Sequence, residues 1–266
     1  SRGTWCTALP LHAVGVAALM TLKAVFFDMD DTLVLTSQCD ALAYAKVEAE
    51  ARRACGDLLD GPQLIADFRS AVKACPWDEA YPDERVPVEE HRAGLWTSAL
   101  RRQLARAHVL ERDGSPEVNE AALRALGARL QAIFNTERLA TFTLVEGAAE
   151  LVARLHERGL ATVVITNGHH QVQHAKIDAG HVAEVFGAEH ILVGGDEVCA
   201  GRQEKPHPGI FHKACSIAGC EPLEVVMVGD NYRVDMAGAA SAGLAAGIWV
   251  NPKGRELQRV PTFPIT

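Results

Sequence analysis

The sequence predicts an α/β protein whose doubly wound parallel sheet is interrupted by an inserted all-helical segment. Short, wholly apolar runs recur along the chain, which is typical of parallel strands buried on both faces. Helical patterns lie between the later runs, which indicates right-handed strand–helix–strand units. The region 37–144 contains no convincing strand pattern and is rich in Ala, Arg, Glu and Leu, so we expect helices there.

The apolar runs place the expected strands along the chain. They are AVFF (24–27), ATVVIT (161–166), HILVGG (190–195), VVMVGD (225–230) and AAGIWV (245–250). Between them, residues 147–159 form a helical pattern that ends at Gly159, a common helix stop. Residues 207–220 form another with Pro208 in its first turn, and the small residues of 235–244 predict a helix lying close to the sheet. The core is therefore expected to be Rossmann-like.

We expect four parts along the chain. Residues 1–19 are an N-terminal extension, 20–36 and 145–256 form the Rossmann-like catalytic core, 37–144 form the helical cap, and 257–266 are an irregular tail. The extension has no acidic residue, and its apolar stretch is too short and too interrupted to span a bilayer. It is either the remnant of a targeting peptide or an addition before Met20. We therefore expect a cytoplasmic protein, with an organellar location as the alternative.

Composition and charge limit the class of protein. Hydrophobic residues make up 48% of the 266 and charged residues 23%, which is ordinary for a globular protein. The formal net charge of −8 argues against a nucleic-acid partner, and no segment predicts a membrane span. The seven cysteines form no C-x-x-C pair and are odd in number, so we expect free thiols.

Polar residues follow the expected strands where ligands bind in open α/β sheets, outside the carboxyl ends. They are Asp28 and Asp30, then Thr166, Asn167 and Gly168, then Lys205 before a helix, and finally Asp230 and Asp235. Carboxylate oxygens suit Mg²⁺, which would also offset the repulsion among the acidic groups. A carboxylate can attack phosphorus, and a second one can exchange a proton with the leaving alcohol and with water. A hydroxyl and a lysine can stabilise the phosphoryl oxygens.

These residues resemble the four motifs of the haloacid dehalogenase superfamily, in order. The motifs are DMDDT (28–32), the threonine of ITNG (165–168), the lysine of EKPHP (204–208) and GDNYRVD (229–235). The resemblance implies that Asp28 is the nucleophile and Asp30 the general acid and base. It implies Mg²⁺ held by Asp28, the backbone carbonyl of Asp30, and Asp230, with Asp235 as a supporting carboxylate. The insertion looks like the superfamily's helical cap, with hinges near residues 35–37 and 142–147.

Within the superfamily, the stretches TNGHHQVQHAKIDAG, VMVGDNYRVDMAGAASAGL and WVNPKG resemble the N-acylneuraminate-9-phosphatases. That resemblance implies a small phosphorylated metabolite as substrate, with N-acylneuraminate 9-phosphate first, and phosphoglycolate or a nucleotide as alternatives. His169 and His170 depart from the pattern. Being adjacent, they should not point the same way in regular structure, and His169 is a candidate substrate contact. Trp77, Tyr81 and Trp96 of the cap either pack in its core or line the pocket.

Two other functions stay open from the sequence. A 2-haloacid dehalogenase would need neither Mg²⁺ nor an acid at Asp30, so that residue argues against it. A phosphatase-like subunit without catalysis would keep the same fold. We expect a monomer or a homodimer, and neither state has a signature in the sequence.

Overall fold

The computed structural model describes residues 22–74, 87–107, 119–252, 254 and 263. The chain divides into two compact units, which are described separately. Unit 1 comprises Ser1–Thr36 with Phe142–Thr266, and unit 2 comprises Ser37–Thr141. The expected N-terminal extension lies outside the described residues, and so does the tail 257–266 apart from Phe263. No helix in the described part of the chain has both the length and the apolar character that a bilayer crossing requires.

Unit 1 is built on a parallel five-stranded sheet in the order β3-β2-β1-β4-β5. The strands are β1 (Ala24–Phe27), β2 (Ala161–Thr166), β3 (Ile191–Val193), β4 (Val225–Gly229) and β5 (Ala246–Trp249). The predicted fold class is confirmed. Central β1 pairs with both β2 and β4, and Phe27 stands opposite Val164 and Val228. The register therefore brings the loops after β1, β2 and β4 to one edge of the sheet.

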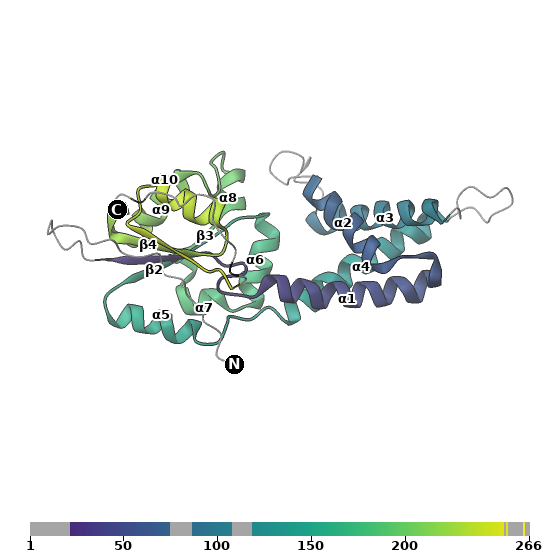
Figure 1. Cartoon of the computed structure of the whole chain (residues 1–266), viewed down its shortest axis with the longest axis horizontal. Helices are drawn as coiled ribbons and strands as arrows, with labels where there is room; N and C mark the ends of the chain where they lie inside the picture. The colour runs from purple at the N-terminus through teal and green to yellow at the C-terminus, as the bar shows by residue number, and fades with distance from the viewer. Residues whose placement is uncertain (1–21, 75–86, 108–118, 253, 255–262, 264–266) are drawn as a thin grey trace. The chain divides into compact units, whose positions relative to one another are not determined.

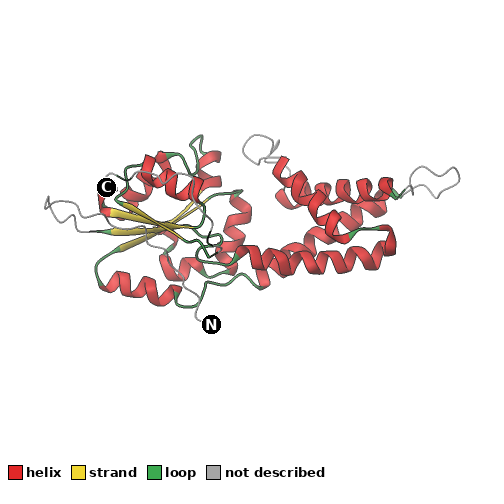
Figure 2. Ribbon diagram, in the orientation of Figure 1, coloured by secondary structure: helices red, strands yellow, loops and turns green. Residues whose placement is uncertain are grey.

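Helices cover both faces of this sheet, as expected for a doubly wound fold (Figures 1 and 2). In Figure 1, α9 and α10 lie on one side of the strands and α5 and α7 on the other. Apolar side chains of α9 pack with those of β1, β2 and β4 in one core cluster. The helices of unit 1 are α5 (Ala148–Glu157), α6 (His170–Ala179), α7 (Val182–Phe186), α8 (Gly194–Cys199), α9 (Pro208–Ala218) and α10 (Ala237–Ser241). Short 3-10 turns lie at Ala188–His190 and Pro222–Glu224.

Two predicted elements of unit 1 differ from the structure. The strand expected over 190–195 ends at Val193, and Gly194 and Gly195 begin α8. A Cβ atom on Gly195 would lie 2.4 Å from the backbone oxygen of Gly168, so glycine permits the close approach of this turn to the loop after β2. The helix expected over 235–244 is a wide π turn, Tyr232–Met236, followed by the short α10.

The described secondary-structure elements of unit 2 are all helical, as predicted. Its helices are α1 (Thr36–Cys55, whose first residue belongs to unit 1), α2 (Gly61–Ala74), α3 (Val88–Arg106) and α4 (Glu120–Ala140), with a 3-10 turn at Gly56–Leu58. The core centres on Trp96, which is fully buried and stacks on Phe68 at 3.7 Å between ring centroids. Trp96 is therefore a core residue. Trp77 and Tyr81 lie outside the described residues.

A close crossing of α3 and α4 gives a test of this packing. A Cβ atom on Gly127 would lie 2.3 Å from Thr97 Oγ1 and 2.7 Å from the backbone oxygen of Ala93. We expect Gly127→Ala to lower the free energy of unfolding by about 1–3 kcal/mol because the helices must separate. Chemical denaturation measures the change.

The matched control is Gly94→Ala on α3, where an added Cβ meets nothing within 4 Å. Alanine has the higher helix propensity, so this variant should gain up to about 1 kcal/mol. Equal gains for both variants would contradict the packing described for α3 and α4.

The prediction of free thiols can be compared only with the described cysteines. None of these takes part in a disulfide: Cys39, Cys55, Cys199, Cys215 and Cys220. Burial raises the pKa of the Cys215 thiol to about 12, so this sulfur stays protonated. Cys6 and Cys75 lie outside the described residues.

Candidate active site

The carboxyl ends of β1 and β4 bring acidic side chains together. Asp28 follows β1 directly, and Asp230 follows β4. Carboxylate oxygens of Asp28, Asp230 and Asp235 all lie within 4.8 Å of one another. The structure thus brings together three of the four acidic residues that the sequence predicted to converge, and the fourth, Asp30, has other partners.

Lys205 bridges two of these carboxylates. Its Nζ donates to Asp28 Oδ1 at 2.6 Å and to Asp235 Oδ1 at 2.7 Å. Lys205 is 2% exposed and Asp235 is 1% exposed. Burial opposes the charge on the lysine, but the two aspartates outweigh it and raise the Lys205 pKa above its ordinary value. Burial also raises the pKa of Asp28 to about 7, against the lowering influence of Lys205 and with a further rise caused by Asp235.

The loop that carries Lys205 is held by Asn167. Asn167 Nδ2 donates to the backbone oxygen of Lys205 at 2.6 Å, and the backbone nitrogen of Lys205 donates to Asn167 Oδ1 at 3.0 Å. The Asn167 side chain is therefore engaged in fixing the lysine. The direct contact with substrate that the sequence suggested for Asn167 stays a prediction.

Asp235 is fixed by the π turn after β4. Its Oδ2 accepts a hydrogen bond from the backbone nitrogen of Asn231 at 2.9 Å, while Asn231 Oδ1 accepts from the backbone nitrogens of Arg233 and Val234. The residue that caps this turn is thus Asn231. A Cβ atom on Gly229 would lie 2.4 Å from Asp235 Oδ2, so only glycine leaves room for this carboxylate. These contacts hold the Asp235 carboxylate beside Lys205. The supporting role expected for Asp235 stays a prediction.

The donor set suits a hard divalent cation. It consists of three carboxylates, with Lys205 as the cation that pairs with two of them, so negative charge is in excess when all are ionised. Oxygen ligands of this kind are those that Mg²⁺ takes in proteins. The residues present therefore fit the metal that the sequence predicted.

Asp30 lies beside this cluster in a separate network. Its carboxylate accepts hydrogen bonds from Thr36 Oγ1 at 2.6 Å, from Gln173 Nε2 at 3.0 Å, and from Lys176 Nζ at 2.8 Å to each oxygen. Burial alone would raise the Asp30 pKa, but the ion pair with Lys176 and these hydrogen bonds lower it to about 2. The side chain of Asp30 stays 32% exposed. It is thus ionised at neutral pH and still open on one side.

The remaining predicted residues lie at the end of β2 and the start of α6. Thr166 is fully buried, and its Oγ1 accepts from Gln173 Nε2 at 2.8 Å, which leaves the hydroxyl hydrogen to be donated. The backbone nitrogen of Gly168 donates to Glu204 Oε2 at 3.1 Å. His169 is 6% exposed, and its ring stacks on that of His170 at 4.4 Å.

The stacking corrects the expectation that the two histidines point in different directions. His169 precedes the first turn of α6 and has an extended ψ of 129°, so regular alternation does not apply to it. No role for His169 in binding substrate is tested by these contacts, and that role stays a prediction.

Gln173 and Lys176 were missed by the sequence reasoning, which searched loops at strand ends. Both lie on α6, three residues apart and hence on one helical face, next to buried Ile177. The sequence holds no clear signal for them, because only Ile177 is apolar among the buried residues of this helix. Thr36 was missed for a similar reason, because it begins α1 beyond the first motif.

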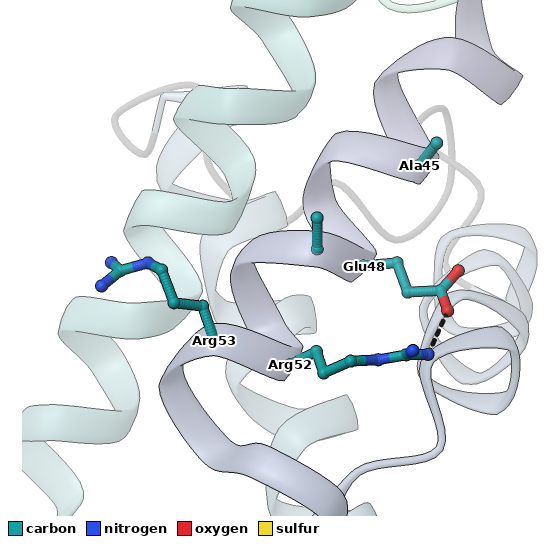
Figure 3. Close-up of a pocket in the computed structure, with 5 residues that line it drawn as sticks. Ala45, Glu48, Arg52 and Arg53 are labelled. Atoms are coloured by element: carbon teal, nitrogen blue, oxygen red, sulfur yellow. Dashed lines mark hydrogen bonds and ion pairs between the residues drawn. The ribbon is translucent and has the colours of Figure 1, made fainter.

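A hollow of about 480 Å³ lies elsewhere, on α1 of unit 2 (Figure 3). Its lining consists of Ala45, Glu48, Ala49, Arg52 and Arg53. Arg52 pairs with Glu48 at 2.8 Å and Arg53 with Glu50 at 2.8 Å, each within one turn of the helix. Glu50 also pairs with Arg129 of α4 at 2.6 Å, so the acidic groups beside these arginines are already paired with cations. The candidate active site remains the strand-end cluster of unit 1.

Comparison with known proteins supports this assignment. A family model described as haloacid dehalogenase-like hydrolase matches residues 22–243. The chain is 29% identical over 236 residues to N-acylneuraminate-9-phosphatase of Homo sapiens, covering 89% of this chain and 85% of that protein. It is 30% identical to phosphoserine phosphatase of Thermus thermophilus, covering 86% and 89%.

A solved structure shares the fold. The putative HAD-hydrolase YfnB from Bacillus subtilis, described as bound to magnesium, superposes with a TM-score of 0.58 at 20% identity. The superposition covers 91% of this chain and 93% of that one. At this identity the likeness concerns the fold alone.

Proposed function

Because the chain belongs to the haloacid dehalogenase-like hydrolase family and is a phosphatase like its named relatives, we propose that it is a Mg²⁺-dependent phosphomonoesterase acting through an aspartyl phosphate. The observation that carries the proposal is the bridge from Lys205 Nζ to Asp28 and Asp235, with Asp230 in the same carboxylate group. This arrangement supplies a nucleophile, a buried positive charge and a set of hard oxygen ligands.

The first step is phosphoryl transfer to Asp28. Its carboxylate oxygen attacks phosphorus, the ester P–O bond breaks, and the leaving alkoxide takes a proton from Asp30. Since Asp30 is ionised in the free protein, this proton enters with the monoanionic form of the phosphate ester. Lys205 and the Thr166 hydroxyl stabilise charge on the phosphoryl oxygens.

The second step returns the enzyme to its starting state. A water oxygen attacks the phosphorus of the aspartyl phosphate, the acyl phosphate P–O bond breaks, and Asp30 takes the proton from that water. Asp30 is ionised at neutral pH, so its carboxylate has the free lone pair that accepts this proton. Mg²⁺ held by Asp28, Asp230 and the backbone carbonyl of Asp30 would neutralise the phosphoryl oxygens and polarise the phosphorus in both steps.

The leading substrate is a sugar phosphate, and N-acylneuraminate 9-phosphate is the first candidate. The likeness to N-acylneuraminate-9-phosphatase, which extends over 89% of this chain, supports it. Phosphoserine, phosphoglycolate and a nucleoside monophosphate are the competing substrates. A comparison of kcat/KM across this panel decides among them.

Removal of the metal is expected to abolish activity. The protein should hydrolyse para-nitrophenyl phosphate with Mg²⁺ present, and EDTA should reduce the rate at least about 10³-fold, because three carboxylates converge with too little positive charge to bind an anionic phosphate ester. Excess Mg²⁺ should restore the rate. Release of nitrophenolate measures it.

A folded protein that hydrolyses no phosphate ester of the panel with Mg²⁺ present would overturn the proposal. That result would instead support a subunit with no catalytic role. Activity that is unchanged by EDTA would contradict the metal dependence while leaving the phosphatase assignment in place.

A further inference from the structure

Two buried polar residues of α6, Gln173 and Lys176, contact the acid and base of the proposed reaction. Gln173 is 2% exposed and Lys176 is 4% exposed, and their spacing of three residues places them on one face of the helix. Both side chains reach Asp30, which is distant from them in sequence. Neither residue lies at a strand end, and the reaction as derived above gives them no task.

Lys176 makes a two-point contact with the Asp30 carboxylate. Its Nζ is 2.8 Å from both Oδ1 and Oδ2, and it also lies 5.7 Å from the centre of the Phe142 ring. A buried ammonium is costly to desolvate, and an ion pair of this kind is often no more stabilising than apolar residues of the same size. Stability alone therefore gives little reason for a lysine at this position.

Gln173 joins Asp30 to Thr166 and Asn167 at the end of β2. Its Nε2 donates to Asp30 Oδ2 at 3.0 Å, to Thr166 Oγ1 at 2.8 Å, and to the backbone oxygen of Asn167. All of these partners accept a hydrogen bond, which fixes the amide with its nitrogen toward them. One side chain thus sets the position of the Asp30 carboxylate relative to the Thr166 hydroxyl.

We propose that Gln173 and Lys176 are positioning residues that hold the Asp30 carboxylate in place for proton transfer to the leaving group and from water. With Thr36 Oγ1, they contact the carboxylate from several directions and select one orientation of it. The exposed part of Asp30 then faces the reacting atoms. This inference rests on the proposed function, because it assigns a role within that reaction.

If Gln173 and Lys176 position Asp30, their loss should affect alkyl and nitrophenyl esters differently, whereas general unfolding would affect both esters alike. An alkyl phosphate releases a strongly basic alkoxide and needs the proton from Asp30, whereas para-nitrophenolate is weakly basic and leaves without one. A displaced Asp30 should therefore impair attack on alkyl esters, while Asp28 is still phosphorylated by para-nitrophenyl phosphate. Hydrolysis of the resulting aspartyl phosphate by water should then be slow, since that step also needs Asp30.

The test compares Lys176→Met and Gln173→Leu with the wild type, all with Mg²⁺. The probes are para-nitrophenyl phosphate and the alkyl ester of the substrate panel that the wild type hydrolyses fastest. Each variant should lose about 10²-fold or more in kcat for the alkyl ester. With para-nitrophenyl phosphate it should release one equivalent of nitrophenolate in a rapid burst, followed by slow turnover. Competitive inhibition by inorganic phosphate should change less than about threefold, because the carboxylate cluster and Lys205 are intact.

Lys213→Met is the matched control, because Lys213 lies in the same unit and is 41% exposed, and its partner Glu197 keeps a second ion pair with Arg202. This variant should hydrolyse both substrates at rates close to those of the wild type. Slow turnover of para-nitrophenyl phosphate without a nitrophenolate burst in the α6 variants, or no loss of kcat for the alkyl ester, would overturn the positioning role. A wild type that hydrolyses no ester would instead count against the proposed function itself, so the two failures are distinguishable.

Discussion

Asp28→Asn is expected to lower hydrolysis of every phosphate ester by at least about 10⁴-fold, because the amide oxygen is a poor nucleophile for phosphorus. The amide has nearly the size of the carboxylate, so the contacts of β1 and Lys205 need little rearrangement. Steady-state rates with Mg²⁺ measure the loss. Asp31→Asn is the control, since Asp31 lies in the adjacent turn with a φ of 55°, which asparagine adopts readily. Its activity should stay near that of the wild type.

The same Asp28→Asn variant should be more stable than the wild type when the metal is chelated. The pKa of Asp28 is about 7 in the folded protein, whereas its ordinary value, taken for the unfolded chain, is 3.8. Burial is the main cause of the rise. The folded state therefore binds this proton more tightly, and the wild type loses stability as the pH rises from about 4 to about 7. Asparagine has no proton to lose, so the advantage of the variant should grow across that range to at most roughly 4 kcal/mol.

Urea unfolding of both proteins in EDTA at several pH values measures this difference. Below pH 4 the two should agree closely, because Asp28 of the wild type is then protonated in both the folded and the unfolded state. A variant that is inactive and also less stable at neutral pH would mean that the introduced amide disturbs the fold, and its inactivity would then say nothing about the nucleophile.

Lys205→Met should give the largest loss of stability in the site. Its ammonium is buried between Asp28 and Asp235, and removing one partner of a buried ion pair typically costs about 3–5 kcal/mol. Hydrolysis should fall about 10²-fold or more, because the positive charge beside the phosphoryl oxygens is lost. Unfolding by urea and steady-state rates measure the two effects.

A second substitution separates charge from packing. Asp235→Asn added to Lys205→Met removes one buried carboxylate, so it should recover part of the lost stability without restoring activity. Lys213→Met should cost no more than about 1 kcal/mol, because the lysine is 41% exposed and Glu197 keeps its ion pair with Arg202. If Lys205→Met were as mild as Lys213→Met, the ion-pair network described for the site would be contradicted.

The sequence predicted most of the sheet because parallel strands buried on both faces are apolar along their whole length. Asp28 and Asp230 were predicted to meet for the same reason, since the ends of paired parallel strands lie at one edge. The end of β3 was not predictable from composition. Whether two glycines extend a strand or begin a helix depends on the backbone that approaches them, here the loop at Gly168.

The polar residues of helices were harder to predict than those of loops. Lys176 has an ordinary place in a helical pattern, and only the approach of α6 to the first motif shows that it meets Asp30. Asn167 illustrates the reverse case. Its position after β2 suggested a contact with substrate, but an amide serves a neighbouring backbone equally well, and the structure pairs it with Lys205.

The most direct measurement is mass spectrometry of the protein quenched in acid within milliseconds of mixing with a substrate and Mg²⁺. The account predicts that one phosphoryl group is attached to the peptide that contains Asp28, that hydroxylamine removes it, and that Asp28→Asn abolishes it. Turnover of the ester with no phosphorylated peptide, or with the label on another residue, would contradict the account.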